Sequence, residues 1–117
     1  MNFIAGLDTR PQAEIRSVQL ELLREQVRYA LVRSPFYRER LAGVDVDSLS
    51  MDDLSGVPLT SKEDIQRENR AFLCVEDKEI AEVVATTGTT GEHVWVYLTK
   101  NDLVRLAENE RRYFTYA

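Results

Sequence analysis

The sequence predicts an α/β fold (α+β if the chain is a fragment) with a helical N-terminal region, a strand–loop–strand hairpin and a closing helix. Two observations carry this prediction. Apolar residues recur at helical spacing through the first third of the chain, whereas two runs rich in β-branched and aromatic residues come later and are joined by a Thr- and Gly-rich run. The α/β pattern consists of a single hairpin with its following helix, and two strands do not form an independently stable sheet. We therefore expect these 117 residues to be a segment of a longer protein.

A long amphipathic helix is predicted from Pro11 to Arg33, because a proline is tolerated in the first turn. Its apolar residues follow i, i+3 and i+4 spacing: Ile15, Val18, Leu20, Leu22, Leu23, Val27, Ala30 and Leu31. The pair Ser34-Pro35 ends this helix, since the residue before a proline is pushed away from helical geometry. The same pair predicts a short second helix, with Ser34 as its N-cap and Pro35 as its first residue.

Three capping boxes predict where one turn and two further helices begin, because a hydroxyl residue followed three positions later by an acid can cap a helix. They predict a turn at 51–55, a helix at about 61–69 and a helix from about 100 to 115. The pairs are Ser50 with Asp53, Thr60 with Glu63, and Thr99 with Asp102.

Two strands are predicted between the last two helices. Glu79–Thr86 is rich in Ile and Val, and His93–Leu98 alternates in the period-two manner of a strand. His93 is the only histidine of the chain, and an exposed residue at a strand start is its simplest interpretation.

The composition, 44% hydrophobic and 30% charged, is that of a folded globular protein. The net charge of −5 comes from residues 51–82, which hold nine acidic and four basic residues, and this argues against nucleic acid as a partner. No apolar run approaches the roughly 20 residues of a membrane span, and no secretory signal is evident. Cys74 is alone, which excludes an internal disulfide. We expect a cytoplasmic protein with no membrane partner.

The run Thr86–Gly91 is the candidate functional site. Threonine hydroxyls at 86, 87, 89 and 90 can donate to phosphate oxygens, and glycines at 88 and 91 permit the positive φ that lets backbone N–H groups converge on an anion. A plain hairpin turn is the alternative, although six residues exceed what a tight hairpin needs. The run is not an NTPase P-loop, because no lysine follows Gly91.

Four segments together resemble the adenylate-forming superfamily, and specifically its phenylacetate–CoA ligase branch. Thr86–Gly91 is similar to the superfamily's Ser/Thr/Gly-rich phosphate-binding motif. Arg33–Arg38, Val57–Asp64 and Tyr97–Leu103 resemble segments of that branch and occur in the family's order. The resemblance covers most of residues 16–106.

This resemblance implies a two-step ligase that uses ATP and Mg, with coenzyme A as co-substrate. A carboxylic acid is converted to an acyl-adenylate, and a thiol then displaces AMP. The implied cofactor-binding residues are Thr86, Thr87, Gly88, Thr89, Thr90 and Gly91. Residues 1–78 would form a helical N-terminal region and residues 79–117 the start of the nucleotide-binding subdomain of the adenylate-forming large domain. The family's catalytic parts lie further along the chain, so this piece is expected to contain no catalytic residue and to be inactive alone.

The sequence departs from the family pattern directly after the loop. Many members have a proline and then Lys or Thr where His93 and Val94 stand here, and Glu92 adds a negative charge. The loss of proline predicts a more flexible exit, and the other changes argue against tight ATP binding. Two alternatives to the acid–CoA ligase stay open, namely a synthetase that adenylates another acceptor, such as a deazaflavin, and a non-catalytic small domain that binds a nucleotide or a partner. Self-association or a homodimer is a further expectation.

Overall fold

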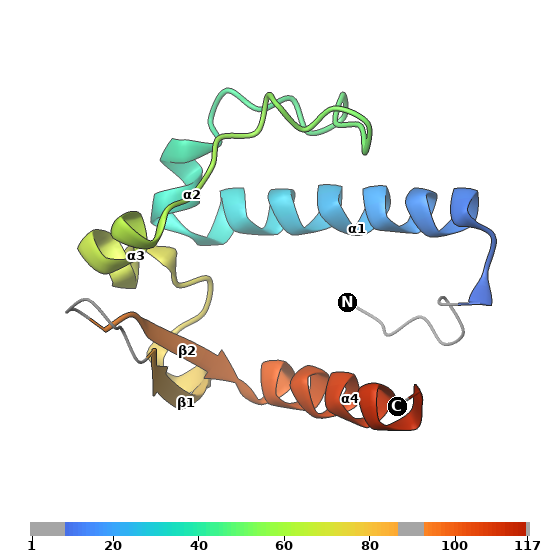
Figure 1. Cartoon of the computed structure of the whole chain (residues 1–117). Helices are drawn as coiled ribbons and strands as arrows, with labels where there is room; N and C mark the ends of the chain where they lie inside the picture. The colour runs from blue at the N-terminus through green and yellow to red at the C-terminus, as the bar shows by residue number, and fades with distance from the viewer. Residues whose placement is uncertain (1–8, 87–92, 117) are drawn as a thin grey trace. The chain divides into compact units, whose positions relative to one another are not determined.

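The computed structural model describes residues 9–86 and 93–116. Within these ranges the helical elements come first, followed by an antiparallel hairpin and a final helix, which confirms the predicted fold class (Figure 1). The elements are α1 (Gln12–Arg33), α2 (Pro35–Arg40), α3 (Lys62–Glu68), the short 3-10 helices η2 (Asn69–Phe72) and η3 (Asp77–Glu79), β1 (Ile80–Ala85), β2 (Trp95–Thr99) and α4 (Lys100–Tyr116).

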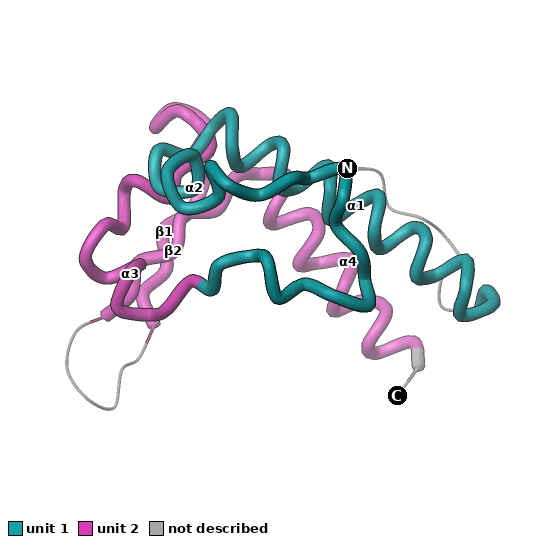
Figure 2. Tube along the Cα trace, turned by 90° about the horizontal axis from the view of Figure 1, so that it is seen from above, with its two compact units in different colours: residues 1–59 teal, residues 60–117 magenta. Residues whose placement is uncertain are grey.

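The chain divides into two compact units, Met1–Leu59 and Thr60–Ala117 (Figure 2). The first unit holds α1, α2 and the segment that follows them, and the second holds α3, the hairpin and α4. The predicted boundary between residues 78 and 79 is of another kind, because it divides the chain by function, into a helical region and a nucleotide-binding subdomain. This functional boundary stays a prediction.

The junction between α1 and α2 forms as the sequence predicts. Ser34 adopts an extended conformation with φ −95° and ψ 122°, and its hydroxyl accepts a hydrogen bond from the Tyr37 amide at 3.3 Å. Pro35 occupies the first turn of α2, and Ser34 is fully buried. Pro11 lies one residue before α1, at the N-cap position. The proline-containing pair therefore both ends one helix and starts the next.

The core of the first unit lies between α1 and the segment that returns along it. Val27, Leu41 and Leu49 form the buried cluster. Arg24 of α1 donates to the carbonyl oxygens of Asp47 at 2.7 Å and Leu49 at 2.8 Å, which fixes the returning segment to the helix. The partly buried side chains packed against the cluster are Leu20, Leu23, Leu31, Tyr37, Val44, Val46 and Val57.

The three predicted capping boxes have different outcomes. The box of Thr99 and Asp102 is confirmed, since the Thr99 amide donates to the Asp102 carboxylate at 2.8 Å and the Asp102 amide donates back to the Thr99 hydroxyl at 3.2 Å. The box predicted at Thr60 and Glu63 is wrong, because the structure forms it one residue later, at Ser61 and Asp64.

No box forms at Ser50 and Asp53 either. The Ser50 hydroxyl accepts from the Asp52 amide at 3.2 Å, and the Asp53 carboxylate accepts from the Ser55 amide at 2.9 Å. These are two local turns of the kind that Ser and Asp side chains make with the backbone two residues on. Hydrogen bonds from Ser55 lower the pKa of the Asp53 carboxyl.

The hairpin pairs β1 with β2 in antiparallel register. Val83 lies opposite Tyr97, Ala85 lies opposite Trp95, and an irregularity between Ile80 and Glu82 shifts the register near the start of β1. Both strands are shorter than predicted at the loop end, where β1 ends at Ala85 and β2 begins at Trp95. Thr86, the first residue of the Thr- and Gly-rich run, therefore follows β1 directly, and His93 and Val94 directly precede β2.

No helix among the described residues combines the length and the apolar character needed to cross a bilayer.

Candidate functional site

The described part of the candidate site is the root of the hairpin, where the chain leaves β1 at Thr86 and returns at His93 and Val94. The Thr86 amide donates to the Val94 carbonyl at 2.9 Å. The Val94 amide donates to the Thr86 side-chain Oγ1 at 3.1 Å. Two hydrogen bonds thus join Thr86 to Val94 at the root of the hairpin, one through the backbone and one through a side chain.

The Thr86–Val94 pair departs from a regular antiparallel ladder. In a hydrogen-bonded pair of such a ladder, each residue gives its N–H to the carbonyl of the other. Here the Val94 amide bonds the Thr86 hydroxyl in place of the Thr86 carbonyl. Since Val94 is buried, with 6% of its surface exposed, the hydroxyl provides an acceptor for an amide that would otherwise be costly to leave unpaired.

His93 bonds the carbonyl that the Val94 amide does not use. Its Nδ1 lies 2.6 Å from the Thr86 carbonyl oxygen. A carbonyl oxygen only accepts, so Nδ1 carries the hydrogen of this bond, and Nε2 is the ring nitrogen without a hydrogen in the neutral imidazole. Thr86 therefore accepts at both its hydroxyl and its carbonyl, from the two successive residues that directly precede β2.

The hydroxyl of Thr86 retains the capacity that the sequence analysis assigned to it. A threonine hydroxyl has one hydrogen to donate and two lone pairs to accept with. Its bond from Val94 uses a lone pair, so the same oxygen can still donate its hydrogen to a phosphate oxygen.

Residues preceding β1 anchor the start of β2. The side-chain Nδ2 of Asn69, at the C-terminal end of α3, donates to the Trp95 carbonyl oxygen at 2.8 Å. The guanidinium of Arg70 lies 5.8 Å from the centre of the Tyr97 ring and forms an ion pair with Asp77. The hydrogen bond to Asp77 is the largest cause of the raised pKa of Arg70. The segment after α3 therefore holds the strand directly beyond the hairpin root.

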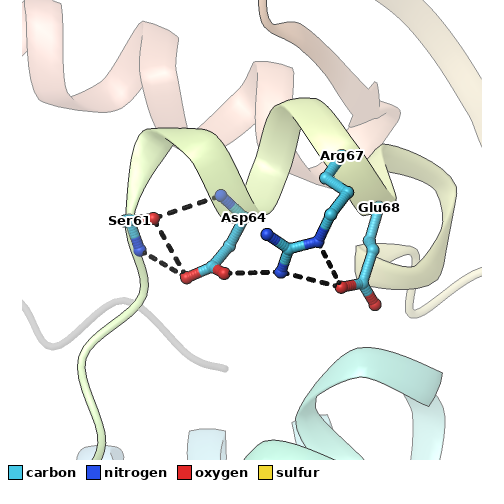
Figure 3. A network of polar contacts seen from close by, with 4 residues as sticks. All are labelled: Ser61, Asp64, Arg67 and Glu68. Carbon is cyan, nitrogen blue, oxygen red and sulfur yellow. Dashed lines mark hydrogen bonds and ion pairs between the residues drawn. The ribbon is translucent and has the colours of Figure 1, made fainter.

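A polar network runs along α3, from its N-cap Ser61 to its last residue Glu68 (Figure 3). The buried Asp64 carboxylate accepts from the Ser61 amide at 3.0 Å and from the Ser61 hydroxyl at 3.1 Å. Its other oxygen accepts from the Arg67 guanidinium at 2.9 Å, and Arg67 also bonds Glu68 at 3.0 Å. The pKa of Arg67 is raised by its hydrogen bonds, most by the one to Glu68 and next by the one to Asp64.

Of the six predicted site residues, Thr86 lies in the described part of the chain. The other five, Thr87, Gly88, Thr89, Thr90 and Gly91, lie outside it, and their roles stay predictions. His93 and Asn69 were not predicted to contribute. The signal that could have indicated His93 is its polar side chain two residues after Gly91. The described residues contain no group of three or more His, Cys, Asp or Glu placed to hold a metal ion.

The chain is similar in sequence to known ligases over most of its length. It is 41% identical over 113 residues to the phenylacetate-coenzyme A ligase of Thermus thermophilus, covering 92% of this chain and 25% of the relative. It is 37% identical over 102 residues to the enzyme of the same name from Aromatoleum evansii, covering 83% of this chain and 23% of the relative. The chain thus spans about a quarter of the length of these relatives. No protein-family model matches it.

The chain is also similar to a solved structure. The crystal structure of 2-hydroxyisobutyryl-CoA ligase, in complex with 2-HIB-AMP and CoA, superposes with a TM-score of 0.71 and 28% sequence identity. The match covers 86% of this chain and 25% of that one.

The helical region, the hairpin and the following helix are therefore the fold of part of an adenylate-forming ligase. The recognition made from the four motifs is confirmed by both kinds of similarity. Within that class, the chain resembles a part of the phenylacetate–CoA ligases.

Proposed function

We propose that this chain is the N-terminal part of an ATP-dependent acid–CoA ligase and that it contributes the loop that holds the phosphates of ATP. The hairpin root is the observation that carries the proposal. Three hydrogen bonds between Thr86 and the pair His93 and Val94 join the chain where it enters the Thr- and Gly-rich run to the chain that precedes β2. Bonds at the base of an anion-binding loop reduce the ordering that its donors must undergo on binding.

The role of such a loop follows from the chemistry of adenylation. When a carboxylate attacks the α-phosphate of ATP, the bond to the β-phosphate breaks and negative charge develops on the pyrophosphate that leaves. Hydroxyl and backbone N–H donors arranged beforehand stabilise that charge without reorganising at the moment of reaction. The stretch from Val83 to Gly91 contains no carboxylate that would repel the phosphates.

The second step transfers the acyl group to a thiol, coenzyme A in the proposed ligase, with release of AMP. Magnesium would neutralise phosphate charge, and the resemblance implies that its ligands lie in the part of the ligase that follows this chain. The carboxylic acid, ATP and coenzyme A are the proposed small-molecule partners. The cytoplasmic location and the homodimer are further parts of the proposal.

Pyrophosphate exchange tests the proposal. A longer protein that includes this chain and the remaining three quarters of a ligase should incorporate labelled pyrophosphate into ATP when an aryl acid such as phenylacetate is added. The 117-residue chain alone should remain at background. Exchange by the short chain would contradict its proposed inactivity, and a longer protein that exchanges with no carboxylic acid would contradict the ligase assignment.

A further inference from the structure

We propose that His93 is a positioning residue, a side-chain latch that joins the two strands at the root of the hairpin by donating from Nδ1 to the Thr86 carbonyl. The distance of 2.6 Å between these atoms is that of a short hydrogen bond. His93 is exposed, so its ring is not held there by burial, and the bond itself explains the orientation.

The Thr86 carbonyl needs a hydrogen-bond partner such as His93 because the Thr86 hydroxyl takes its usual one. Because that hydroxyl takes the Val94 amide, the Thr86 carbonyl loses the partner that a regular ladder would give it. The His93 ring replaces this partner. One backbone bond of the ladder is thus exchanged for two side-chain bonds, and the identities of residues 86 and 93 control how the two strands are joined at the hairpin root.

Fixed ends matter because the run is long for a hairpin connection. Closing a loop has an entropic cost, and donors that are already arranged bind an anion more tightly than donors that must be ordered on binding. The latch would also replace the rigidity that the proline of the family pattern supplies at this position. This part of the inference rests on the proposed phosphate-binding function.

Two amide side chains separate the roles of the two ring nitrogens. The Nδ2 of an asparagine lies at about the position of a histidine Nδ1, whereas the longer glutamine places its amide nitrogen near the position of Nε2. His93→Asn therefore preserves the donor to Thr86, and His93→Gln is the matched control that preserves size and polarity but moves the donor. His93→Ala removes it.

The first experiment measures the latch in the 117-residue chain, without any ligand. Nitrogen chemical shifts of the His93 ring should show the hydrogen of the neutral form on Nδ1. Hydrogen exchange of the Thr86 and Val94 amides should be about two- to tenfold faster in His93→Ala and His93→Gln, the effect of one lost hydrogen bond. His93→Asn should keep the original rates. A hydrogen on Nε2 alone, or equal exchange in all three variants, overturns the inference, and the ring shifts decide it even where a variant does not fold.

The second experiment adds inorganic pyrophosphate and follows its binding by calorimetry. Affinity should fall by about two- to tenfold in His93→Ala and His93→Gln and be restored in His93→Asn. If the unmodified chain shows the latch but binds no pyrophosphate, the proposed function fails while the latch stands. If pyrophosphate binds all variants equally, the proposed function stands and the positioning role of His93 is wrong.

Discussion

The side-chain Oγ1 of Thr86 lies 3.1 Å from the amide nitrogen of Val94, in the position that a backbone carbonyl would take in a regular ladder. The buried Val94 amide therefore depends on the chemistry of residue 86. The Thr86 hydroxyl, which the sequence analysis predicts to bind phosphate, also accepts a hydrogen bond from the Val94 amide. Substitutions of Thr86 therefore affect the hairpin as well as the predicted phosphate site.

Thr86→Val and Thr86→Ser separate these effects. Valine has the shape of threonine without the hydroxyl, so it leaves the buried Val94 amide without its acceptor, at a cost of about 1–3 kcal/mol in the free energy of unfolding. Serine keeps the oxygen and should lose much less. Urea denaturation of the two variants measures the difference. Equal losses would show that the methyl group of Thr86, and not its hydroxyl, is what the hairpin root requires.

The start of α3 shows what local patterns leave undecided. The stretch Thr60–Asp64 contains two overlapping boxes, Thr60 with Glu63 and Ser61 with Asp64, and both satisfy the spacing rule. The structure forms the second, in which Asp64 is buried while Glu63 is exposed. Packing of the helix decides that Asp64, and not Glu63, forms the capping box. The spacing of residues in the sequence carries no information on that packing.

Asp64→Ala tests this assignment, with Glu63→Ala as its matched control. Loss of the Asp64 carboxylate removes the acceptor for the Ser61 amide, the Ser61 hydroxyl and the Arg67 guanidinium. The free energy of unfolding should fall by about 1–2 kcal/mol, the range for a lost helix cap. Glu63→Ala should stay within about 0.5 kcal/mol, as exposed substitutions do. Thermal unfolding of both variants decides, and a larger effect at Glu63 would restore the box predicted from sequence.

Glu108 gives a prediction about pH. Hydrogen bonds from Arg111, both at 2.7 Å, and then from Arg112 lower the pKa of the Glu108 carboxyl from 4.5 to about 2. A carboxyl with a lower pKa in the folded state stabilises that state at pH values above 4.5. The stabilisation is then lost as the pH falls from 4.5 towards 2.

Carbon chemical shifts of the Glu108 side chain, followed between pH 6 and pH 2, measure this pKa. Arg111→Gln should move it back towards 4.5, and Arg112→Gln should move it less. Glu108→Gln should remove the corresponding acid dependence of α4 stability. An unchanged pKa in Arg111→Gln would mean that the ion pair does not form in solution.

Self-association is expected from the exposed apolar side chains of α4 and of the hairpin. Tyr113 and Phe114 are 70% and 74% exposed, and Trp95 is 50% exposed. Among the described residues, each strand also pairs on one side alone, so its other edge presents unpaired backbone groups. Sedimentation velocity should show species larger than a monomer as concentration rises. Combined Tyr113→Ser and Phe114→Ser substitutions should reduce them, whereas Val32→Ser, which removes an exposed apolar side chain from α1, should not.

The elements of this chain were more predictable than its site. Helix ends at Ser34-Pro35 and at Thr99 depend on residues within four positions, so local rules suffice for them. The contact of His93 with Thr86 spans seven residues and depends on the strand register, and that of Asn69 with Trp95 spans twenty-six. Such contacts follow from tertiary packing, which the pattern of one sequence does not specify.

The last prediction concerns the loop itself, in the longer ligase proposed above. Replacing Thr89 and Thr90 by Val preserves shape and β-propensity but removes two hydroxyl donors. If these donors hold the pyrophosphate in the transition state, each loss should raise the barrier to adenylation by about 1.5–3 kcal/mol, the range for hydrogen bonds to charged groups. Thioester formation from a supplied acyl-adenylate should stay near its original rate, because no pyrophosphate leaves in that step. Thr115→Val, in α4, is the control for the loss of a threonine hydroxyl elsewhere, and unfolding of each variant excludes loss of structure as the cause. A double variant that adenylates its acid at the original rate, with the same dependence on ATP, would show that the run is a connecting turn and would remove the phosphate-binding role from the proposal.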